Sequence, residues 1–233
     1  MRKARFYYLL RRGLLTGAAS FIKEGLVMAN KFITQGLTFP AQGSAEFNGT
    51  SDYIQLPDAF SHTNHTIAAW VYFDDTSGSN VFFDNRDAND DGIRLLQSAG
   101  DLTYQINAVD RSASVAASKW YYVSASYNGT TQSLFIDGSL MVSGTTSQSI
   151  SATTNALIGR QSYAAVSYML GNLANVAIWN RALTSDEINS VMWKPYQALS
   201  STETSGLQAW YSLDNIDGST VPDSTGNHNG TAN

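Results

Sequence analysis

The stretch that decides the fold runs from Ser133 to Met192. It reads SLFIDGSLMVSG at 133–144, NALIGRQ at 155–161 and LGNLANVAIWNRALTSDEINSVM at 170–192. Three strand-like runs, each bounded by Gly or Asx turns, lead into one short helix. Thr184 is a good N-cap for that helix, and Glu187 three residues later completes a capping box. This order of elements predicts a β-rich fold that carries a single short helix.

Strand signals continue on both sides of this stretch. TIAAWVYF at 66–73 is apolar on both faces, as expected of a strand buried inside a sandwich. KWYYVSASYNGTTQSLFIDG at 119–138 predicts a hairpin that turns at Asn128-Gly129. GLQAWYSL at 206–213 predicts a last strand. Further strand-like runs, at short spacing, are NVFFDN, GIRLLQ and DLTYQINA. Regular short strands with polar turns predict a two-sheet, all-β sandwich.

The composition suits such a sandwich. Charged residues make up 14% of the 233 residues, well below the ~25% of an average globular protein. Ser, Thr, Asn, Gly and twelve Tyr take their place, which is typical of polar, uncharged loops. The chain has no cysteine, so disulfides and Cys-based zinc or thiol chemistry are excluded.

Charge is distributed unevenly along the chain. Residues 1–31 hold seven basic residues against one acidic residue, a net charge of +6. The remainder holds seven basic and eighteen acidic residues, a net charge of −11. A basic arm on an acidic body indicates that the arm docks on something acidic, and the acidic body argues against nucleic-acid binding by that body.

The arm at 1–31 is predicted to be partly helical. An apolar stripe with basic residues outside it favours an anchor into a larger assembly; a helix packed on its own domain and a membrane-surface helix are the alternatives. The residues expected to act in docking are Arg2, Lys3, Arg5, Leu10, Arg11, Arg12, Leu14 and Phe21. No uninterrupted apolar segment precedes a convincing cleavage site, and none approaches the ~20 residues that a transmembrane helix needs. The sequence thus predicts an arm at 1–31 and one domain at 32–233 that includes the strand at 206–213.

Four segments carry a resemblance to a known family. FNGTSDYIQLP, TIAAWVYF, KWYYVSASYNGTTQSLFIDG and GNLANVAIWNRALTSDEIN resemble the laminin-G-like, concanavalin A-like jelly roll, and its pentraxin-like branch in particular. The resemblance covers about residues 41–215. It implies an antiparallel jelly-roll sandwich with the helix packed across one sheet, a fold used mostly for binding and for building surfaces.

The acidic loop DNRDANDDGIRL at 84–95 is the best candidate metal site. Asp87, Asn89 and Asp91 supply alternating oxygen ligands, as in the first half of a calcium loop. The resemblance to pentraxins implies calcium ligands here as well, through Asp90 and Asp91. It also implies acidic residues just after NALIG, where Arg160 stands instead. Calcium is therefore one expectation for this loop, and a solvated acidic hairpin loop is the alternative that the residues favour.

The aromatic residues divide into core and surface candidates. Four tryptophans lie in predicted strands and are expected in the core: Trp70, Trp120, Trp179 and Trp210. Tyr104, Tyr163 and Tyr168 lie near predicted loops, where tyrosine rings can stack on a glycan. The sequence therefore nominates these three tyrosines as glycan contacts.

Signals for catalysis are weak. Retaining glucanases need two carboxylates at fixed separation, and the E-x-D-x-x-E strand of the concanavalin A-like glucanases is absent. His62-x-x-His65 has no predicted helix beneath it, which disfavours zinc. Asp223 and Asn227 are a second, weaker calcium candidate. We expect no catalytic residues.

Three functions remain open. The first is a non-enzymatic bacteriophage virion protein (capsid decoration, fibre or tail-associated), docked on other virion proteins through its arm, with host glycans as the expected ligand of its jelly roll. The second is a secreted, calcium-dependent carbohydrate-binding module. The third, a carbohydrate-active enzyme, lacks a carboxylate pair. The first explains the basic arm and the acidic body together, so we expect location on a virion, with the extracellular space as the alternative, and a homo-oligomer.

Overall fold

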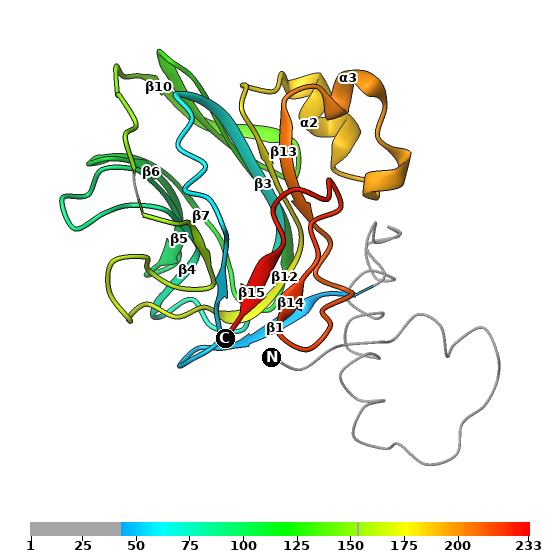
Figure 1. Cartoon of the computed structure of the whole chain (residues 1–233). Helices are drawn as coiled ribbons and strands as arrows, with labels where there is room; N and C mark the ends of the chain where they lie inside the picture. The colour runs from blue at the N-terminus through cyan, green and yellow to red at the C-terminus, as the bar shows by residue number, and fades with distance from the viewer. Residues whose placement is uncertain (1–42, 153) are drawn as a thin grey trace.

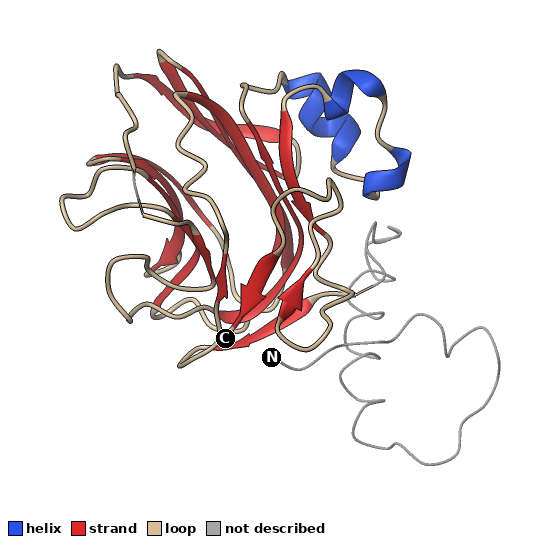
Figure 2. Ribbon diagram, viewed as in Figure 1, coloured by secondary structure: helices blue, strands red, loops and turns tan. Residues whose placement is uncertain are grey.

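The computed structural model describes residues 43–152 and 154–233. Within them the chain forms two antiparallel sheets packed face to face, with short helices on the outside of one sheet (Figure 1, Figure 2). The expected all-β jelly-roll sandwich is therefore confirmed. The predicted helical arm at 1–31 lies outside the described residues. No helix in the described part of the chain is both long and apolar enough to cross a membrane.

The first sheet has seven strands, in the order β1-β12-β3-β8-β9-β10, with β13 also paired to β12. Its hairpin between β8 and β9 turns at Asn128-Gly129 as predicted, because Tyr127 pairs with Gln132. The strand predicted at 206–213 is β13, which pairs with the second half of β12. The strands are β1 (Ala45–Asn48), β3 (Asn64–Phe73), β8 (Trp120–Asn128), β9 (Thr131–Ile136), β10 (Ser139–Thr145), β12 (Leu170–Trp179) and β13 (Leu207–Tyr211).

The second sheet has eight strands, in the order β14-β15-β2-β11-β4-β5-β6-β7. Its strands are β2 (Ile54–Gln55), β4 (Ser79–Asp84), β5 (Ile93–Ser98), β6 (Asp101–Ile106), β7 (Val109–Ser114), β11 (Leu157–Ile158), β14 (Thr220–Val221) and β15 (Gly230–Ala232). The turn at Asn48-Gly49 does not make a hairpin, because β1 pairs with β12 whereas β2 pairs with β11 and β15. The turn therefore carries the chain from one sheet to the other.

The main core lies between the two sheets. Side chains alternate along each strand, so every second residue faces inward. On β3, Ile67, Ala69 and Val71 join this core, while Trp70 and Tyr72 face outward and are nonetheless buried. The expectation that this strand is buried on both faces is confirmed.

The outward residues of β3 are buried because the helices cover that face. The helices are α2 (Ser185–Val191), the 3₁₀ helix η1 (Tyr196–Ala198) and α3 (Ser201–Thr204). Ile188 and Val191 of α2 pack with Trp70, Trp179 and Trp210 in a second apolar cluster. All four tryptophans predicted for the core are buried. One face of the seven-stranded sheet is thus closed by helices.

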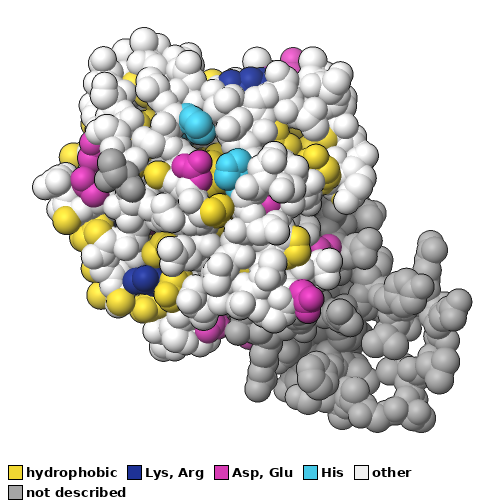
Figure 3. Space-filling model, in the orientation of Figure 1, with side chains coloured by type: hydrophobic (Ala, Val, Ile, Leu, Met, Phe, Trp, Pro, Cys, Tyr) yellow, Lys and Arg dark blue, Asp and Glu magenta, His cyan; other side chains and the backbone are white. Residues whose placement is uncertain are grey.

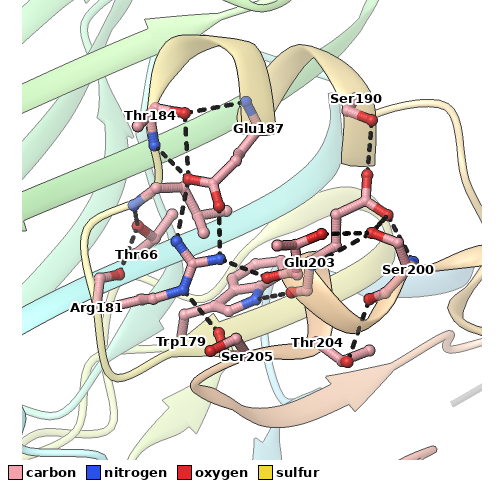
Figure 4. A network of polar contacts seen from close by, with 12 residues as sticks. Thr66, Trp179, Arg181, Thr184, Glu187, Ser190, Ser200, Glu203, Thr204 and Ser205 are labelled. Atoms are coloured by element: carbon pink, nitrogen blue, oxygen red, sulfur yellow. Dashed lines mark hydrogen bonds and ion pairs between the residues drawn. The ribbon is translucent and has the colours of Figure 1, made fainter.

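Two capping boxes hold the helices in place. Thr184 and Glu187 cap α2 as predicted, and Ser200 and Glu203 cap α3 in the same way. Glu203 also accepts hydrogen bonds from Ser190 Oγ (2.6 Å) and Lys194 Nζ (2.5 Å), so it ties α3 to α2 (Figure 4). Its backbone carbonyl accepts a bond from Trp179 Nε1 of β12 (2.8 Å), which fixes the pair of helices to the sheet.

Candidate functional site

The outer face of the eight-stranded sheet carries a row of side chains that points away from the core. Register partners in neighbouring strands place their side chains on one side of a sheet. The row runs through Gln55, Leu157, Asp84, Arg94, Gln105 and Asp110. Their strand neighbours Ile54, Phe83 and Ile93 belong to the core. Among the described residues, both α-helices lie on the other sheet (Figure 2), so this face is left for loops.

Residues 160–168, between β11 and β12, form the loop that borders this row; we call it the 160–168 loop. Gly159 starts it with φ +96°, and a Cβ at that position would lie 2.4 Å from the Phe47 ring. Glycine therefore lets the chain leave β11 sharply. Ser167 accepts a backbone bond from Val81 of β4 (3.2 Å), and the Ser162 hydroxyl lies 3.2 Å from Asp84 Oδ1. These bonds hold the loop against the edge of the site.

A buried ion pair lies beneath the loop. Arg86 is 1% exposed, with Nε 3.4 Å from Asp84 Oδ1 and Nη1 2.5 Å from Asp90 Oδ1. Nη1 also donates to Gln105 Oε1 (2.6 Å). Burial raises the pKa of Asp84, and the Arg86 charge opposes that shift. Asp84 Oδ2 and Arg86 Nη2 are buried without a hydrogen-bond partner. Asp84 could therefore accept one more hydrogen bond, and Arg86 could donate one more.

The predicted calcium residues point to different partners. Asp87 Oδ1 accepts the backbone N–H groups of Asn89 (2.8 Å) and Asp91 (3.1 Å), and these bonds lower the pKa of Asp87. Asp90 is turned to Arg86, and Asp91 accepts a bond from the Ser151 hydroxyl. Within residues 43–152 and 154–233, no group of three His, Cys, Asp or Glu side chains could hold a metal ion. The arrangement does not fit a calcium site, because the Arg86 guanidinium already supplies a positive charge to Asp84 and Asp90.

The second calcium candidate is also committed to the fold. Asp223 accepts backbone N–H bonds from Trp210 (2.8 Å), Thr225 (3.0 Å) and His228 (3.0 Å), which fix the turn after β14. Asn227 contributes its own backbone N–H to Asp223 (3.2 Å). The pair is therefore a turn anchor in this structure.

Calcium binding by the loop at 84–95 stays a prediction, and a calcium titration checks it. Because the loop carboxylates are already bonded to protein groups, we expect addition of millimolar Ca²⁺ or of EDTA to move the thermal midpoint by less than about 1 °C. A Ca²⁺-dependent rise of several degrees that is abolished in Asp87→Asn would contradict this expectation. The loop would then have to reorganise on binding.

Two of the three predicted glycan tyrosines lie beside this face. Tyr163 is 42% exposed, and the Arg86 guanidinium carbon lies 5.5 Å from its ring centre. Tyr168 is partly exposed, and the Arg160 guanidinium carbon lies 5.9 Å from its ring centre. Arg160 also lies over the ring of Tyr53, at 4.1 Å. The face thus gathers tyrosine rings and guanidinium groups.

The prediction for Tyr104 is wrong. Its side chain is 0% exposed in the main core, and its hydroxyl lies 2.6 Å from His65 Nε2. Alternation along β6 could have revealed this, because Leu102, Tyr104 and Ile106 share the inward face. Tyr104 cannot contact a glycan without unfolding the sandwich.

Sequence reasoning missed three residues of this face. Arg86 and Arg94 lie in the acidic loop at 84–95, and Tyr53 lies in FNGTSDYIQLP, but their residue types alone predict no role there. Arg160 was noted for the acidic residue it displaces. These arginines and Tyr53 come close together because β11 pairs with both β2 and β4. Such long-range pairing leaves no local signal in the sequence.

The described geometry defines a class: a two-sheet jelly roll with one sheet covered by helices. The outer face of the other sheet carries aromatic and cationic side chains and, in the described part of the chain, no helix; we call it the open face. A family comparison refines it, since residues 48–189 match the concanavalin A-like lectin/glucanases superfamily, in its laminin G group. The match spans more than half of the chain. The protein therefore belongs to this family, and the laminin-G-like resemblance is confirmed.

The chain shares its fold with solved structures, and the two comparisons with TM-scores above 0.5 show this. A Bacteroides ovatus ATCC 8483 protein proposed to bind carbohydrate aligns with a TM-score of 0.66 and 18% identity, over 82% of this chain and 57% of its own. The CBM40 domain of the Ruminococcus gnavus IT-sialidase, bound to α2,3-sialyllactose, aligns with a TM-score of 0.54 and 14% identity, over 64% and 96%. A heptameric pentraxin from Limulus polyphemus aligns with a TM-score of 0.49 and 19% identity, over 63% and 80%. A search of curated proteins found no match.

Proposed function

We propose that the jelly roll is a non-enzymatic carbohydrate-binding domain whose binding surface is the outer face of the eight-stranded sheet. The observation that carries the proposal is the set of tyrosines and arginines on that face. Tyr53, Tyr163 and Tyr168 offer apolar rings with polar tips, while Arg94 and Arg160 offer several donors each. Aromatic walls with a few convergent polar groups are the usual composition of a ligand site.

The structural neighbours support this proposal at the level of the fold. The Ruminococcus gnavus domain is recorded with sialyllactose bound, and the Bacteroides ovatus protein is proposed to bind carbohydrate. Both share the sandwich with this chain at low identity. Since fold alone does not determine function, the side chains on the open face remain the main argument.

The positions of the carboxylates favour binding over catalysis. Glu187 and Glu203 are committed to helix caps, and Asp84 is buried against Arg86. Glycoside hydrolysis needs one carboxyl group to donate a proton and a second to act as base or nucleophile. On the open face the described acidic residues near Arg86 are bonded as structural partners, which supports a non-enzymatic role.

A glycan array with the full chain tests the proposal. We expect Tyr163→Ala to weaken binding by about 10-fold, because it removes one exposed aromatic contact worth about 1–1.5 kcal/mol. Trp193→Ala is the matched control: Trp193 is 37% exposed and packs beside Trp70 on the helix-covered sheet. It should leave binding unchanged. The proposal fails if the wild type binds no glycan on the array, or if Trp193→Ala weakens binding and Tyr163→Ala does not.

We also propose that the domain is displayed on a virion through residues 1–31. The support is the charge distribution, with +6 in residues 1–31 and −11 in the remainder. A homo-oligomer and the secreted, calcium-dependent module stay predictions. Immunoblots of purified phage particles and of particles made with a chain lacking residues 1–31 are the test. We expect incorporation of the full chain only; equal incorporation of both, or of neither, would remove the docking role of the arm.

A further inference from the structure

Two of the five arginines in the described part of the chain have no bonded protein partner. Arg86 pairs with Asp84 and Asp90, and Arg181 pairs with Glu187. Arg111 donates to two backbone carbonyls. The side chains of Arg94 and Arg160, by contrast, make no hydrogen bond or ion pair within residues 43–152 and 154–233, and the Nε atom of each is buried without a partner. Both belong to the open face described above.

Arg160 is held in position by aromatic rings instead. Its guanidinium carbon lies 4.1 Å from the ring centre of Tyr53 and 5.9 Å from that of Tyr168. All three side chains are partly exposed. A ring stacked on a guanidinium occupies its face, whereas the five N–H donors lie in its plane. The contacts therefore orient Arg160 and leave its terminal Nη donors without a protein partner among the described residues.

The absence of a carboxylate at Arg160 is unexpected for this protein. Residues 32–233 carry eighteen acidic side chains against seven basic ones, so an arginine has many potential partners nearby. Leaving a buried donor unsatisfied costs about 1–3 kcal/mol. A fixed guanidinium with unused donors is suited to a ligand that brings its own negative charge.

We propose that Arg160, flanked by Tyr53 and Tyr168, is the subsite for the carboxylate of an acidic sugar unit. This inference rests on the proposed glycan-binding function and specifies its ligand class. A carboxylate accepts two parallel N–H bonds from a guanidinium, a geometry that a hydroxyl group cannot reproduce. The neighbouring tyrosine rings supply apolar surface for the body of the sugar ring.

Arg94 extends the subsite across the sheet. It lies on β5, which is separated from β11 by β4 alone, so the two strands are about 10 Å apart at ~4.8 Å per strand. Arg160 follows the end of β11 by two residues. One oligosaccharide can span that distance. Asp84 lies between Leu157 and Arg94 in the register row and is paired with Arg86, so it does not repel an anionic ligand as a free carboxylate would.

The test is an array that pairs each uronic-acid or sialic-acid glycan with its carboxyl-reduced form, probed with the full chain. We expect the wild type to bind acidic members at least about 10-fold better than their reduced forms, because charge-assisted bonds contribute about 1.5–3 kcal/mol. Arg160→Gln should abolish this preference while it leaves binding to neutral members in place. Arg160→Lys keeps the positive charge but lacks the paired N–H donors of a guanidinium, so it should retain only part of the preference for acidic glycans.

Lys119→Gln is the charge-matched control. Lys119 is 45% exposed and precedes β8 of the other sheet, so its loss changes the net charge equally and should leave the preference intact. The inference is overturned if the wild type binds acidic and reduced members equally, if it prefers sulfated glycans over carboxylates, or if Arg160→Gln keeps the preference. Absence of binding to every glycan would instead overturn the proposed function itself. The wild-type comparison needs no variant, so it stands even where a substitution impairs folding.

Discussion

Replacing Glu203 by alanine is expected to lower the free energy of unfolding by about 3 kcal/mol and the thermal midpoint by about 9 °C. The Glu203 side chain is 5% exposed and accepts bonds from Ser190, Lys194 and Ser200. Alanine removes the N-cap partner of α3 and leaves these donors without an acceptor (Figure 4). Differential scanning calorimetry of both chains measures the change.

The exposed capping box provides the control. Glu187 is 25% exposed, so water can replace part of its bonds, and Glu187→Ala should cost only about 1 kcal/mol. An equal loss in both variants would show that the bridge between α2 and α3 contributes little beyond the caps.

Glu203 should also make the stability of the protein depend on pH. Burial alone would raise the pKa of Glu203, but bonds from Lys194, Ser190 and Ser200 outweigh it and lower the pKa to about 2. Its contribution is therefore complete above the ordinary value of 4.5 and is lost as pH falls through 2. The stability difference between wild type and Glu203→Gln should shrink across that window. A difference that is independent of pH from 6 to 2 would contradict the ion-pair explanation.

Most of the fold could be predicted because its signals are local. The capping box at Thr184 and Glu187, the Asn128-Gly129 turn and the doubly apolar run at 66–73 each depend on a few adjacent residues. The strand β7 was not predicted, because its VDRSAS sequence is half exposed and lacks large apolar residues. The strand β15 was not predicted either, since its three residues gain strand structure from pairing with β2 and β14.

The candidate site was predicted less well because its residues meet through tertiary pairing. The loop 84–91 was interpreted by its spacing of oxygen atoms, which is the same whether a metal ion or an arginine lies among them. In the structure the Arg86 guanidinium contacts both Asp84 and Asp90. Sequence spacing could not place Tyr53 beside Arg160, because 107 positions separate them in the chain. Tertiary pairing, rather than motif spacing, therefore brings the residues of this candidate site together.

Acidification from pH 6.5 to 4 is expected to remove about 3 kcal/mol of stability through His65 alone. His65 is fully buried, and Nδ1 lies 2.8 Å from the His62 carbonyl, which can only accept, so Nδ1 carries the proton. Nε2 then accepts a bond from the Tyr104 hydroxyl (2.6 Å). This arrangement satisfies the neutral ring and leaves no place for a second proton.

Burial lowers the pKa of His65 from 6.5 to about 4, although the His62 backbone bond opposes that shift. The unfolded chain therefore takes up a proton at higher pH than the folded one, and stability falls as pH drops from 6.5 through 4. Urea denaturation at half-unit intervals should show this slope already between pH 6.5 and 5, above the range in which Glu203 titrates.

His65→Gln, a neutral amide of similar size, should be less stable at pH 7 but should lack most of the slope. His62→Gln should retain most of it, because His62 is partly exposed, and burial lowers the pKa of His62 while the Asp58 charge opposes that shift. A wild-type stability that is flat between pH 6.5 and 5 would contradict this expectation. It would show that the folded chain accepts a second proton on His65, with Nε2–H donating to the Tyr104 hydroxyl oxygen.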